Sequence, residues 1–442
     1  MVPKLPQSSP RPSHMMSPSL LRAIARAGVA ALCLAIGLAA VLVAMVPPAG
    51  AQQRQRPPQP AAPSQPQTPP ATRPAPAQAN SLIPETTARQ AIIFEMSTGT
   101  VLFEKNADER MPPSSMSKIM TAYVVFDALA RGDLRLEDTL PVSERAWRMQ
   151  GSKTFVPLNE RVKVEDLVRG MIVQSGNDAC IVLAEGLAGS EEAFAERMNA
   201  IAEKIGLKAS RFRNSSGWPD PEHYMTARDL LRLSERLVID FPQYYRYYSE
   251  REFTFGRDSR GTPITQANRN PLLYRQTGTD GIKTGHTDSA GFGLAASAVR
   301  EGRRILLVGN GWQTARARSE ESERLLDWAF REFGTYTLFK AGHPIEAAPV
   351  WLGKMGTVQM AAQHDIVITI PRRFRPQVGA RIAYDAPVPA PVQRGTQIGT
   401  LMITIPERPA MNFALVADAD VERLGYGGRV LAALGYLVLN RR

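Results

Sequence analysis

Three short motifs of hydroxyl, amine and amide side chains follow one another along the chain. A serine hydroxyl is inert at its own pKa and becomes a nucleophile only beside a base. Ser115 and Lys118 are three residues apart, so on a helix their side chains share one face and can touch. This spacing predicts a serine nucleophile with a lysine base. The three motifs are Ser115-Met116-Ser117-Lys118, Ser175-Gly176-Asn177 and Lys283-Thr284-Gly285.

The elements that must position these motifs can be predicted from periodicity and from turn residues. Apolar residues spaced by three to four predict a helix over 115–131, and its first turn offers free backbone N–H groups that stabilise negative charge. Helical patterns dominate 164–240, and 319–333 is expected to be a closing helix. The pattern favours a sheet covered by helices and excludes a doubly wound nucleotide-binding fold. The expected strands are a hairpin over 90–104 and adjacent buried strands at 291–298 and 305–308.

The first 84 residues are not expected to fold. Residues 27–46 form an apolar run with basic residues before it and Ala49-Gly50-Ala51 after it, so 1–51 is predicted to be an export signal. The run is also long enough for a retained membrane anchor, and the sequence leaves both readings open. Residues 52–84 are predicted to be an extended linker, because 52–79 contains nine prolines.

The basic surplus lies at the two ends of the chain. Of the net charge of +11, residues 1–84 carry +7 and residues 336–442 carry +5, so the part between them is almost neutral. This distribution suits an anionic membrane surface and gives no support to nucleic-acid binding. The histidines are scattered and no phosphate-binding loop is present, so no metal or cofactor is expected. Cys180 is expected to be a small core residue.

Composition changes near residue 335. Short β-type runs at 366–370, 381–384 and 400–405 are separated by proline and glycine, which predicts a small β-rich domain over 336–424. In the tail 425–442, residues 429–439 place aliphatic side chains on one helical face. Eleven residues span only about 16 Å, too short to cross a bilayer. The helix is therefore expected to lie in a membrane interface or to dock on its own domain.

At these motifs the chain resembles the low-molecular-weight penicillin-binding proteins, specifically the D-alanyl-D-alanine carboxypeptidases. The flanking segments 98–110 and 280–287 are also similar to that family, and 336–424 and the tail resemble its β domain and its membrane-anchoring helix. The resemblance implies a mixed α/β fold of the β-lactamase/transpeptidase type over 85–335, with an antiparallel sheet beside a helical subdomain.

The resemblance also implies roles for the motif residues. Ser115 would form the acyl-enzyme, Lys118 would take its proton, and Ser175 would pass a proton to the leaving D-alanine. The backbone N–H groups of Ser115 and His286 would form the oxyanion hole. The substrate-binding residues would be Asn177, Lys283, Thr284, Gly285, His286, Arg269 and Arg318.

The resemblance implies removal of the terminal D-alanine from peptidoglycan pentapeptides at the periplasmic face of the inner membrane, with β-lactams as covalent inhibitors. A D,D-endopeptidase that cuts peptidoglycan crosslinks would use the same site, and a non-catalytic wall-binding scaffold is the alternative from another class. A β-lactamase is disfavoured, because its acidic deacylation residue has no obvious counterpart here. The sequence does not give the oligomeric state.

Overall fold

The computed structural model of the chain describes residues 13–15 and 83–439. The predicted export signal or anchor over 1–51 lies outside these residues apart from 13–15, and so does almost all of the predicted linker over 52–84. Among the helices of the described ranges, none combines the length and apolarity that crossing a membrane requires.

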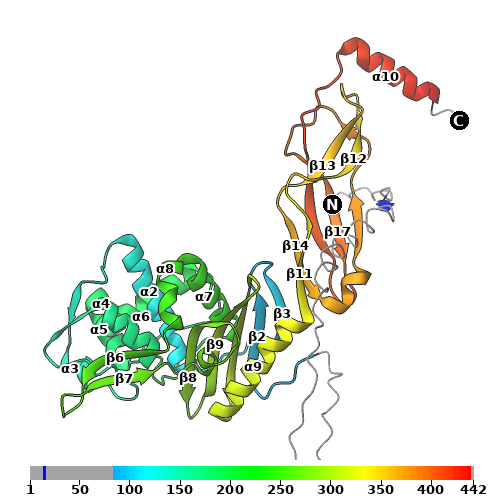
Figure 1. The fold of residues 1–442 in the computed structure, drawn as a ribbon. Helices are drawn as coiled ribbons and strands as arrows, with labels where there is room; N and C mark the ends of the chain where they lie inside the picture. The colour runs from blue at the N-terminus through cyan, green and yellow to red at the C-terminus, as the bar shows by residue number, and fades with distance from the viewer. Residues whose placement is uncertain (1–12, 16–82, 440–442) are drawn as a thin grey trace, which may run out of the picture. The chain divides into compact units, whose positions relative to one another are not determined.

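The centre of the motif-bearing part is a five-stranded antiparallel sheet with the strand order β3-β2-β10-β9-β8 (Figure 1). The predicted hairpin over 90–104 is confirmed as β2 and β3, and the two predicted buried strands are confirmed as the neighbours β9 and β10. The strand bounds are β2 (Gln90–Glu95), β3 (Thr100–Lys105), β8 (Thr279–Thr287), β9 (Gly291–Arg300) and β10 (Arg303–Trp312).

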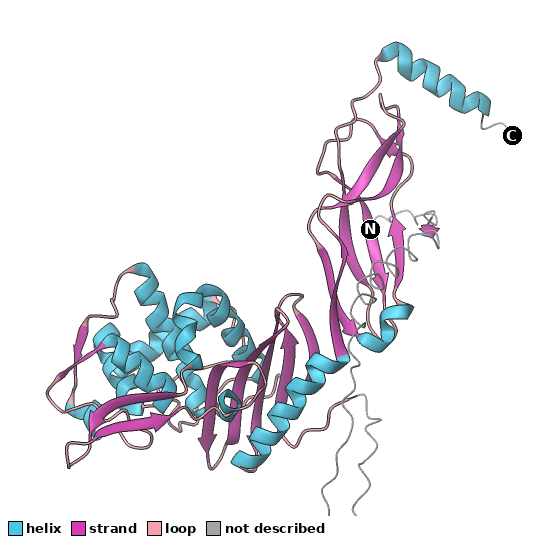
Figure 2. Cartoon of the chain, viewed as in Figure 1, coloured by secondary structure: helices cyan, strands magenta, loops and turns pink. Residues whose placement is uncertain are grey.

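Helices cover both faces of this sheet, because its central strands are apolar on both sides. Ile93 and Leu307 belong to one core cluster together with Trp328 of α9 (Ala315–Glu332). Ile92 and Leu306, one residue along each strand, belong to the other cluster, which contains the buried side chains of the helical subdomain. Figure 2 shows α9 along the sheet and the helices of the helical subdomain grouped to the left of it. The expected mixed α/β fold is confirmed.

The helical subdomain carries the first two motifs. Its first helix α2 (Lys118–Arg131) ends where Gly132 adopts the left-handed conformation, with a φ of 78°. The side chains of Ser190 and Thr226 cap α6 and α7 by accepting from the backbone N–H groups of Ala193 and Asp229, as serine and threonine do at helix starts. The other helical elements are α3 (Glu144–Arg148), α4 (Val164–Arg169), α5 (Asn177–Ala188), α6 (Glu191–Lys204), α7 (Ala227–Asp240) and α8 (Pro242–Tyr245), with the short turns η1 (Ser114–Ser117), η2 (Gly170–Gln174), η3 (Arg246–Ser249) and η4 (Pro271–Tyr274).

The closing helix α9 begins four residues before the predicted start at 319. Thr314 caps it by accepting a hydrogen bond from the N–H of Ala317 at 3.0 Å. A threonine cap fixes where a helix starts independently of the apolar period, which only becomes regular later in α9. Two further two-stranded sheets pair β4 (Thr139–Pro141) with β5 (Arg161–Lys163), and β6 (Glu252–Arg257) with β7 (Pro263–Ala267).

The chain after α9 is β-rich, as the sequence predicts. β14, β15 and β17 contain most of the predicted runs at 366–370, 381–384 and 400–405. The last helix, α10 (Tyr426–Leu439), exposes apolar side chains: Leu431 is 73% exposed and Leu434 is 55% exposed. The larger sheet has the order β1-β15-β17-β18-β13-β12-β16, and β11 pairs with β14. The bounds are β1 (Ser13–Met15), β11 (Phe333–Phe339), β12 (Pro344–Trp351), β13 (Thr357–Ala362), β14 (Ile366–Pro371), η5 (Arg372–Gln377), β15 (Gly379–Ala383), β16 (Val388–Pro389), β17 (Gln397–Thr404) and β18 (Met411–Ala417).

Candidate active site

The nucleophile candidate Ser115 lies in the 3-10 turn η1, which runs directly into α2 at Lys118. Residues three apart in a 3-10 turn are eclipsed, so the two side chains project from one side. Lys118 Nζ lies 2.9 Å from Ser115 Oγ. The sequence predicts an ordinary helix from residue 115; the tighter turn found here gives the same juxtaposition.

The amine of Lys118 is buried and has three polar neighbours. Its side chain is 1% exposed, and Nζ lies 2.8 Å from Asn177 Oδ1 and 2.7 Å from the carbonyl oxygen of Ser216. These two atoms can only accept hydrogen bonds. A neutral amine has two N–H groups and one lone pair. When both N–H groups are donated to these acceptors, the lone pair is left for the hydroxyl of Ser115.

Burial also makes the neutral form of Lys118 accessible. The pKa of Lys118 is lowered to about 8, chiefly because removal from water disfavours the ammonium ion; Cys180 opposes this shift and the nearby Arg269 contributes to it. Roughly a tenth of such a lysine is neutral at pH 7. Cys180 itself is fully buried, as expected of a core residue.

The second motif begins in a strained backbone. Ser175 follows the π-helical turn η2 and has a φ of 62°, a conformation that costs a residue with a Cβ on the order of 1–3 kcal/mol. Asn177 then starts α5, and its Nδ2 donates to the carbonyl oxygen of Gln150 at 2.8 Å. This bond orients the amide so that its oxygen faces Lys118.

The third motif lies on the edge strand β8 and faces the nucleophile turn. The side chains of Lys283 and Thr284 are buried, at 3% and 5% exposed. A Cβ added to Gly285 would lie 2.8 Å from the carbonyl oxygen of Pro113, so only glycine lets β8 approach η1 this closely. The ring of His286 is exposed and stacks on Phe292 with a centroid distance of 4.0 Å.

Three cations gather beside the third motif. The pKa of Lys283 lies well below its ordinary value because of burial and because Lys118, Arg269 and Arg318 are nearby. Burial also lowers the pKa of Arg269, and that of Arg318 to about 10. Arg269 donates to Ser152 Oγ at 2.6 Å, while Nε of Arg318 is buried without a hydrogen-bond partner among the described residues. Like charges held together out of water favour an anion.

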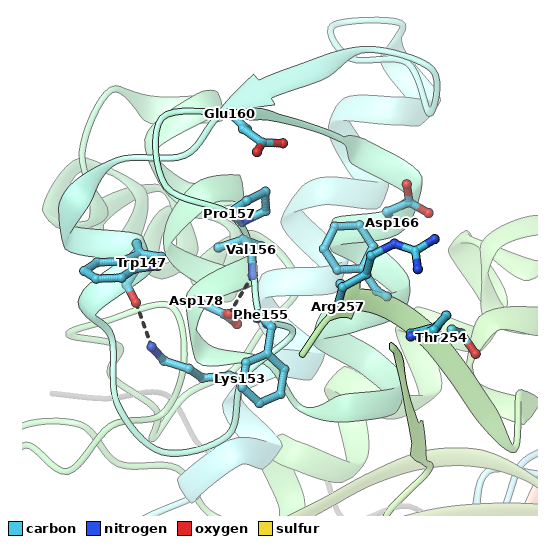
Figure 3. A pocket seen from close by; sticks show the side chains of 13 residues that line it. Trp147, Lys153, Phe155, Val156, Pro157, Glu160, Asp166, Asp178, Thr254 and Arg257 are labelled. Carbon is cyan, nitrogen blue, oxygen red and sulfur yellow. Dashed lines mark hydrogen bonds between the residues drawn. The ribbon is translucent and has the colours of Figure 1, made fainter. Parts of the chain in front are cut away.

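Asp178, next to Asn177, fixes the loop that borders the site. Its carboxylate accepts from the backbone N–H groups of Thr154 and Phe155, both at 2.8 Å, and of Val156 at 3.3 Å. Figure 3 shows Asp178 pointing to this backbone inside a pocket of about 840 Å³ that Trp147 and Arg257 also line. Sequence reasoning missed Asp178, although its place directly after the second motif puts a carboxylate next to the predicted site.

The structure thus brings most of the predicted residues together. Lys118 hydrogen-bonds to Ser115 and Asn177, and the two arginines on which the resemblance puts a carboxylate-binding role lie near Lys283. Sequence reasoning missed Ser216 and Gln150. Both act through backbone carbonyls, which no side-chain pattern reveals.

Comparison with known protein families gives two matches. The family model described as D-alanyl-D-alanine carboxypeptidase, Peptidase S11, matches residues 76–313. The model described as penicillin-binding protein 5, C-terminal domain, matches residues 333–423. Together they cover most of the part of the chain that the structure describes.

Individual relatives agree with this. The D-alanyl-D-alanine carboxypeptidase DacC of Escherichia coli is 38% identical over 355 residues, which are 78% of this chain and 87% of that protein. The crystal structure of penicillin-binding protein 5 from Haemophilus influenzae is 37% identical with a TM-score of 0.68, covering 77% of this chain and 99% of that one. Penicillin-binding protein D2 from Listeria monocytogenes in its ampicillin-bound form is 30% identical with a TM-score of 0.50, covering 56% of this chain and 98% of that one.

Proposed function

We propose that this protein releases the terminal D-alanine of peptidoglycan pentapeptides through an acyl-enzyme on Ser115. The chain belongs to the D-alanyl-D-alanine carboxypeptidase family and is a penicillin-binding serine hydrolase. The observation that carries the residue assignment is the set of three contacts of Lys118 with Ser115, Asn177 and Ser216. They leave the lone pair of a neutral amine free for the serine proton.

In the proposed acylation step, Ser115 Oγ attacks the carbonyl carbon of the penultimate D-alanine, and its proton moves to Lys118 Nζ. The backbone N–H groups of Ser115 and His286 hold the oxyanion of the tetrahedral intermediate. Each such donor typically contributes about 10²–10³ in rate. The intermediate then collapses with cleavage of the amide C–N bond. Ser175 passes the proton from Lys118 to the departing amine of D-alanine.

In the proposed deacylation step, water attacks the ester carbonyl, and the same lysine takes the proton from that water and returns it to Ser115 Oγ. The products are the shortened peptide and the free serine. β-Lactams acylate the same hydroxyl, but they keep the amine attached to the acyl group, so no leaving group departs. We therefore propose that they inactivate the enzyme; the Listeria relative bound to ampicillin supports this.

The proposed seat of the substrate carboxylate is the cationic cluster beside β8. Burial lowers the pKa values of Lys283, Arg269 and Arg318, and the nearby arginines lower that of Lys283 further, so an incoming carboxylate stabilises the charged form of these side chains. Thr284 adds a hydroxyl. Such a site selects peptides that end in a free carboxylate, as a pentapeptide does.

We propose that residues 85–335 form the catalytic domain, 336–424 the β domain and 425–442 a helix that associates with membranes. Export to the periplasmic face of the inner membrane follows from the predicted signal or anchor over 1–51. Tyr426, Val430 and Leu434 of α10 are four residues apart, and each is at least 47% exposed. This apolar stripe, with Arg429 beside it, suits the boundary between headgroups and acyl chains.

Two substrates test the proposal. A peptide ending in D-alanyl-D-alanine and a crosslinked peptide dimer are incubated with the full chain and with Ser115→Ala. We expect the wild type to release D-alanine from the first substrate and to take up a fluorescent penicillin, and Ser115→Ala to do neither. Ser117→Ala is the matched control. Labelling that persists in Ser115→Ala would refute the assignment, and faster cleavage of the dimer would favour the endopeptidase.

A further inference from the structure

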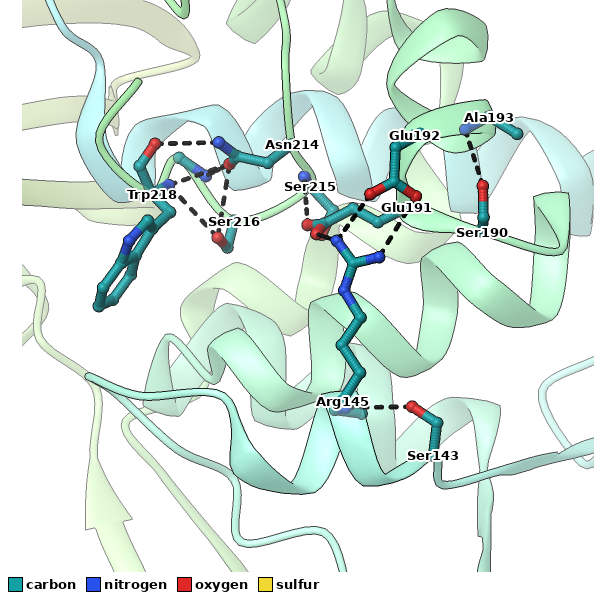
Figure 4. A network of polar contacts seen from close by, with 12 residues as sticks. Ser143, Arg145, Ser190, Glu191, Glu192, Ala193, Asn214, Ser215, Ser216 and Trp218 are labelled. Carbon is teal, nitrogen blue, oxygen red and sulfur yellow. Dashed lines mark hydrogen bonds and ion pairs between the residues drawn. The ribbon is translucent and has the colours of Figure 1, made fainter. Parts of the chain in front are cut away.

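A carboxylate outside the three motifs holds the loop that faces the catalytic lysine. Glu191 is the first residue of α6, and it is only 6% exposed. Its Oε1 accepts two hydrogen bonds from Ser215, from the backbone N–H at 2.9 Å and from the hydroxyl at 2.6 Å. Figure 4 shows this carboxylate pointing into the loop that contains Ser215 and Ser216.

Glu191 is itself fixed. Arg145 of α3 donates to Glu191 Oε2 at 2.7 Å and reaches Glu192 on its other side. The free N–H groups of the first turn of α6 also favour negative charge there. A buried carboxylate is costly unless it is paired and hydrogen-bonded, and Glu191 satisfies both conditions.

The loop is held from the opposite side by α2. The carbonyl oxygen of Ser215 accepts from Thr121 Oγ1 at 2.5 Å, and that of Ser216 accepts from Lys118 Nζ at 2.7 Å. Thr121 lies three residues after Lys118 on the same helix. Ser215 is therefore held on one side by Glu191 and on the other by Thr121 of the helix that carries the base.

We propose that Glu191 is a positioning residue for acylation: by holding Ser215 it fixes the Ser216 carbonyl, which keeps the lone pair of a neutral Lys118 directed at Ser115. This inference rests on the proposed function, in which Lys118 is the base. A neutral amine whose second N–H has lost its acceptor can rotate, and the lone pair then points away from the hydroxyl. Misplacement of about 1 Å can cost on the order of 10²-fold in rate.

The charge of Glu191 adds a second effect. It raises the pKa of Lys118, as do Cys180 and Asp178, whereas burial and Arg269 lower it. The charge of Lys118 in turn lowers the pKa of the buried Lys283. Removal of the negative charge at 191 therefore lowers the pKa of Lys118 and moves the rising limb of the pH–rate profile to lower pH.

The test compares Glu191→Ala, Glu191→Gln and Glu192→Ala in the full chain. The second-order rate constant of acylation by a fluorescent penicillin is measured from pH 5 to 10, with Tm in parallel. In Glu191→Ala, the acylation rate constant at the high-pH plateau of the profile is expected to fall by about 10- to 100-fold. Glu191→Gln retains an acceptor for Ser215, so it is expected to keep most of the plateau while its rising limb moves to lower pH.

Glu192→Ala is the matched control, because it removes the neighbouring carboxylate from the same arginine without touching Ser215. Its profile is expected to overlay that of the wild type. A Glu191→Ala plateau equal to that of the wild type, or an equal loss in Glu192→Ala, would overturn the proposal. If Glu191→Ala does not fold, Ser215→Ala, which removes one of the two bonds, must give a smaller loss in the same direction. Failure of the proposed function would differ, because penicillin would then label the Ser115→Ala protein.

Discussion

Gly285 of β8 lies so close to Pro113 that a Cβ would come within 2.8 Å of the Pro113 carbonyl oxygen. It would also lie 3.1 Å from Cγ of Met116 and 3.3 Å from Cβ of Ser114. The edge strand and the nucleophile turn can pack this way only without a side chain at 285. Because the proposed oxyanion donors come one from each side of this contact, their spacing depends on it.

We expect Gly285→Ala to slow acylation by about 10- to 100-fold, since the added methyl group pushes β8 and η1 apart. Stopped-flow fluorescence with a labelled penicillin measures the rate. Gly356→Ala is the matched control, because nothing lies within 4 Å of its added Cβ. An acylation rate within error of the wild type would show that the oxyanion donors do not depend on the spacing of β8 and η1.

The pH dependence of acylation follows from Lys118. The amine must be neutral to accept a proton, and the pKa of Lys118 is lowered to about 8. The acylation rate is therefore expected to rise as the pH increases through about 8 and to be low at lower pH, where Lys118 is protonated. Lys118→Arg is expected to be nearly as inactive as Lys118→Ala, because a guanidinium stays protonated at any ordinary pH. Near-normal acylation in Lys118→Arg would mean that only a fixed positive charge is needed.

Asp178→Asn is expected to destabilise the protein by about 1–3 kcal/mol, because a neutral amide replaces a carboxylate that accepts from several backbone N–H groups. Urea unfolding followed by circular dichroism measures the change. Asp166→Asn is the control from the same pocket. Burial raises the pKa of the Asp166 carboxyl, so loss of its charge should leave stability unchanged or slightly improved. Equal losses in both variants would point to a general charge effect.

The parts of the site that could be predicted are those that depend on side-chain type at a fixed spacing. Ser115, Lys118 and Asn177 are of this kind: a hydroxyl, an amine and an amide at set offsets. The sheet and its hairpin could also be predicted, since apolar runs and turn residues determine them. The oxyanion donors, the domain limits and the membrane role of the tail stay predictions.

The parts that could not be predicted depend on the backbone and on contacts between distant segments. Ser216 and Gln150 contribute carbonyl oxygens, and every residue has one, so their types carry no signal. The approach of Glu191 to Ser215 joins residues 24 apart in sequence. The close approach of Gly285 to the 3-10 turn at Ser115 is likewise a contact between distant segments.

The exposed helix α10 is expected to hold the protein to membranes. Truncation after Leu424 is expected to weaken association with anionic liposomes and to leave turnover of a soluble peptide unchanged, because the described contacts of the proposed site lie before residue 319. Burial of the apolar stripe contributes about 1.5 kcal/mol or less for each side chain, which suits reversible binding. The truncated and untruncated tails are compared in proteins that start at Gln52 and in proteins that start at Met1. Both are needed because a retained apolar run at 27–46 would itself hold the chain to a membrane. Equal liposome binding by the Gln52 chains with and without the tail would show that α10 is not an anchor.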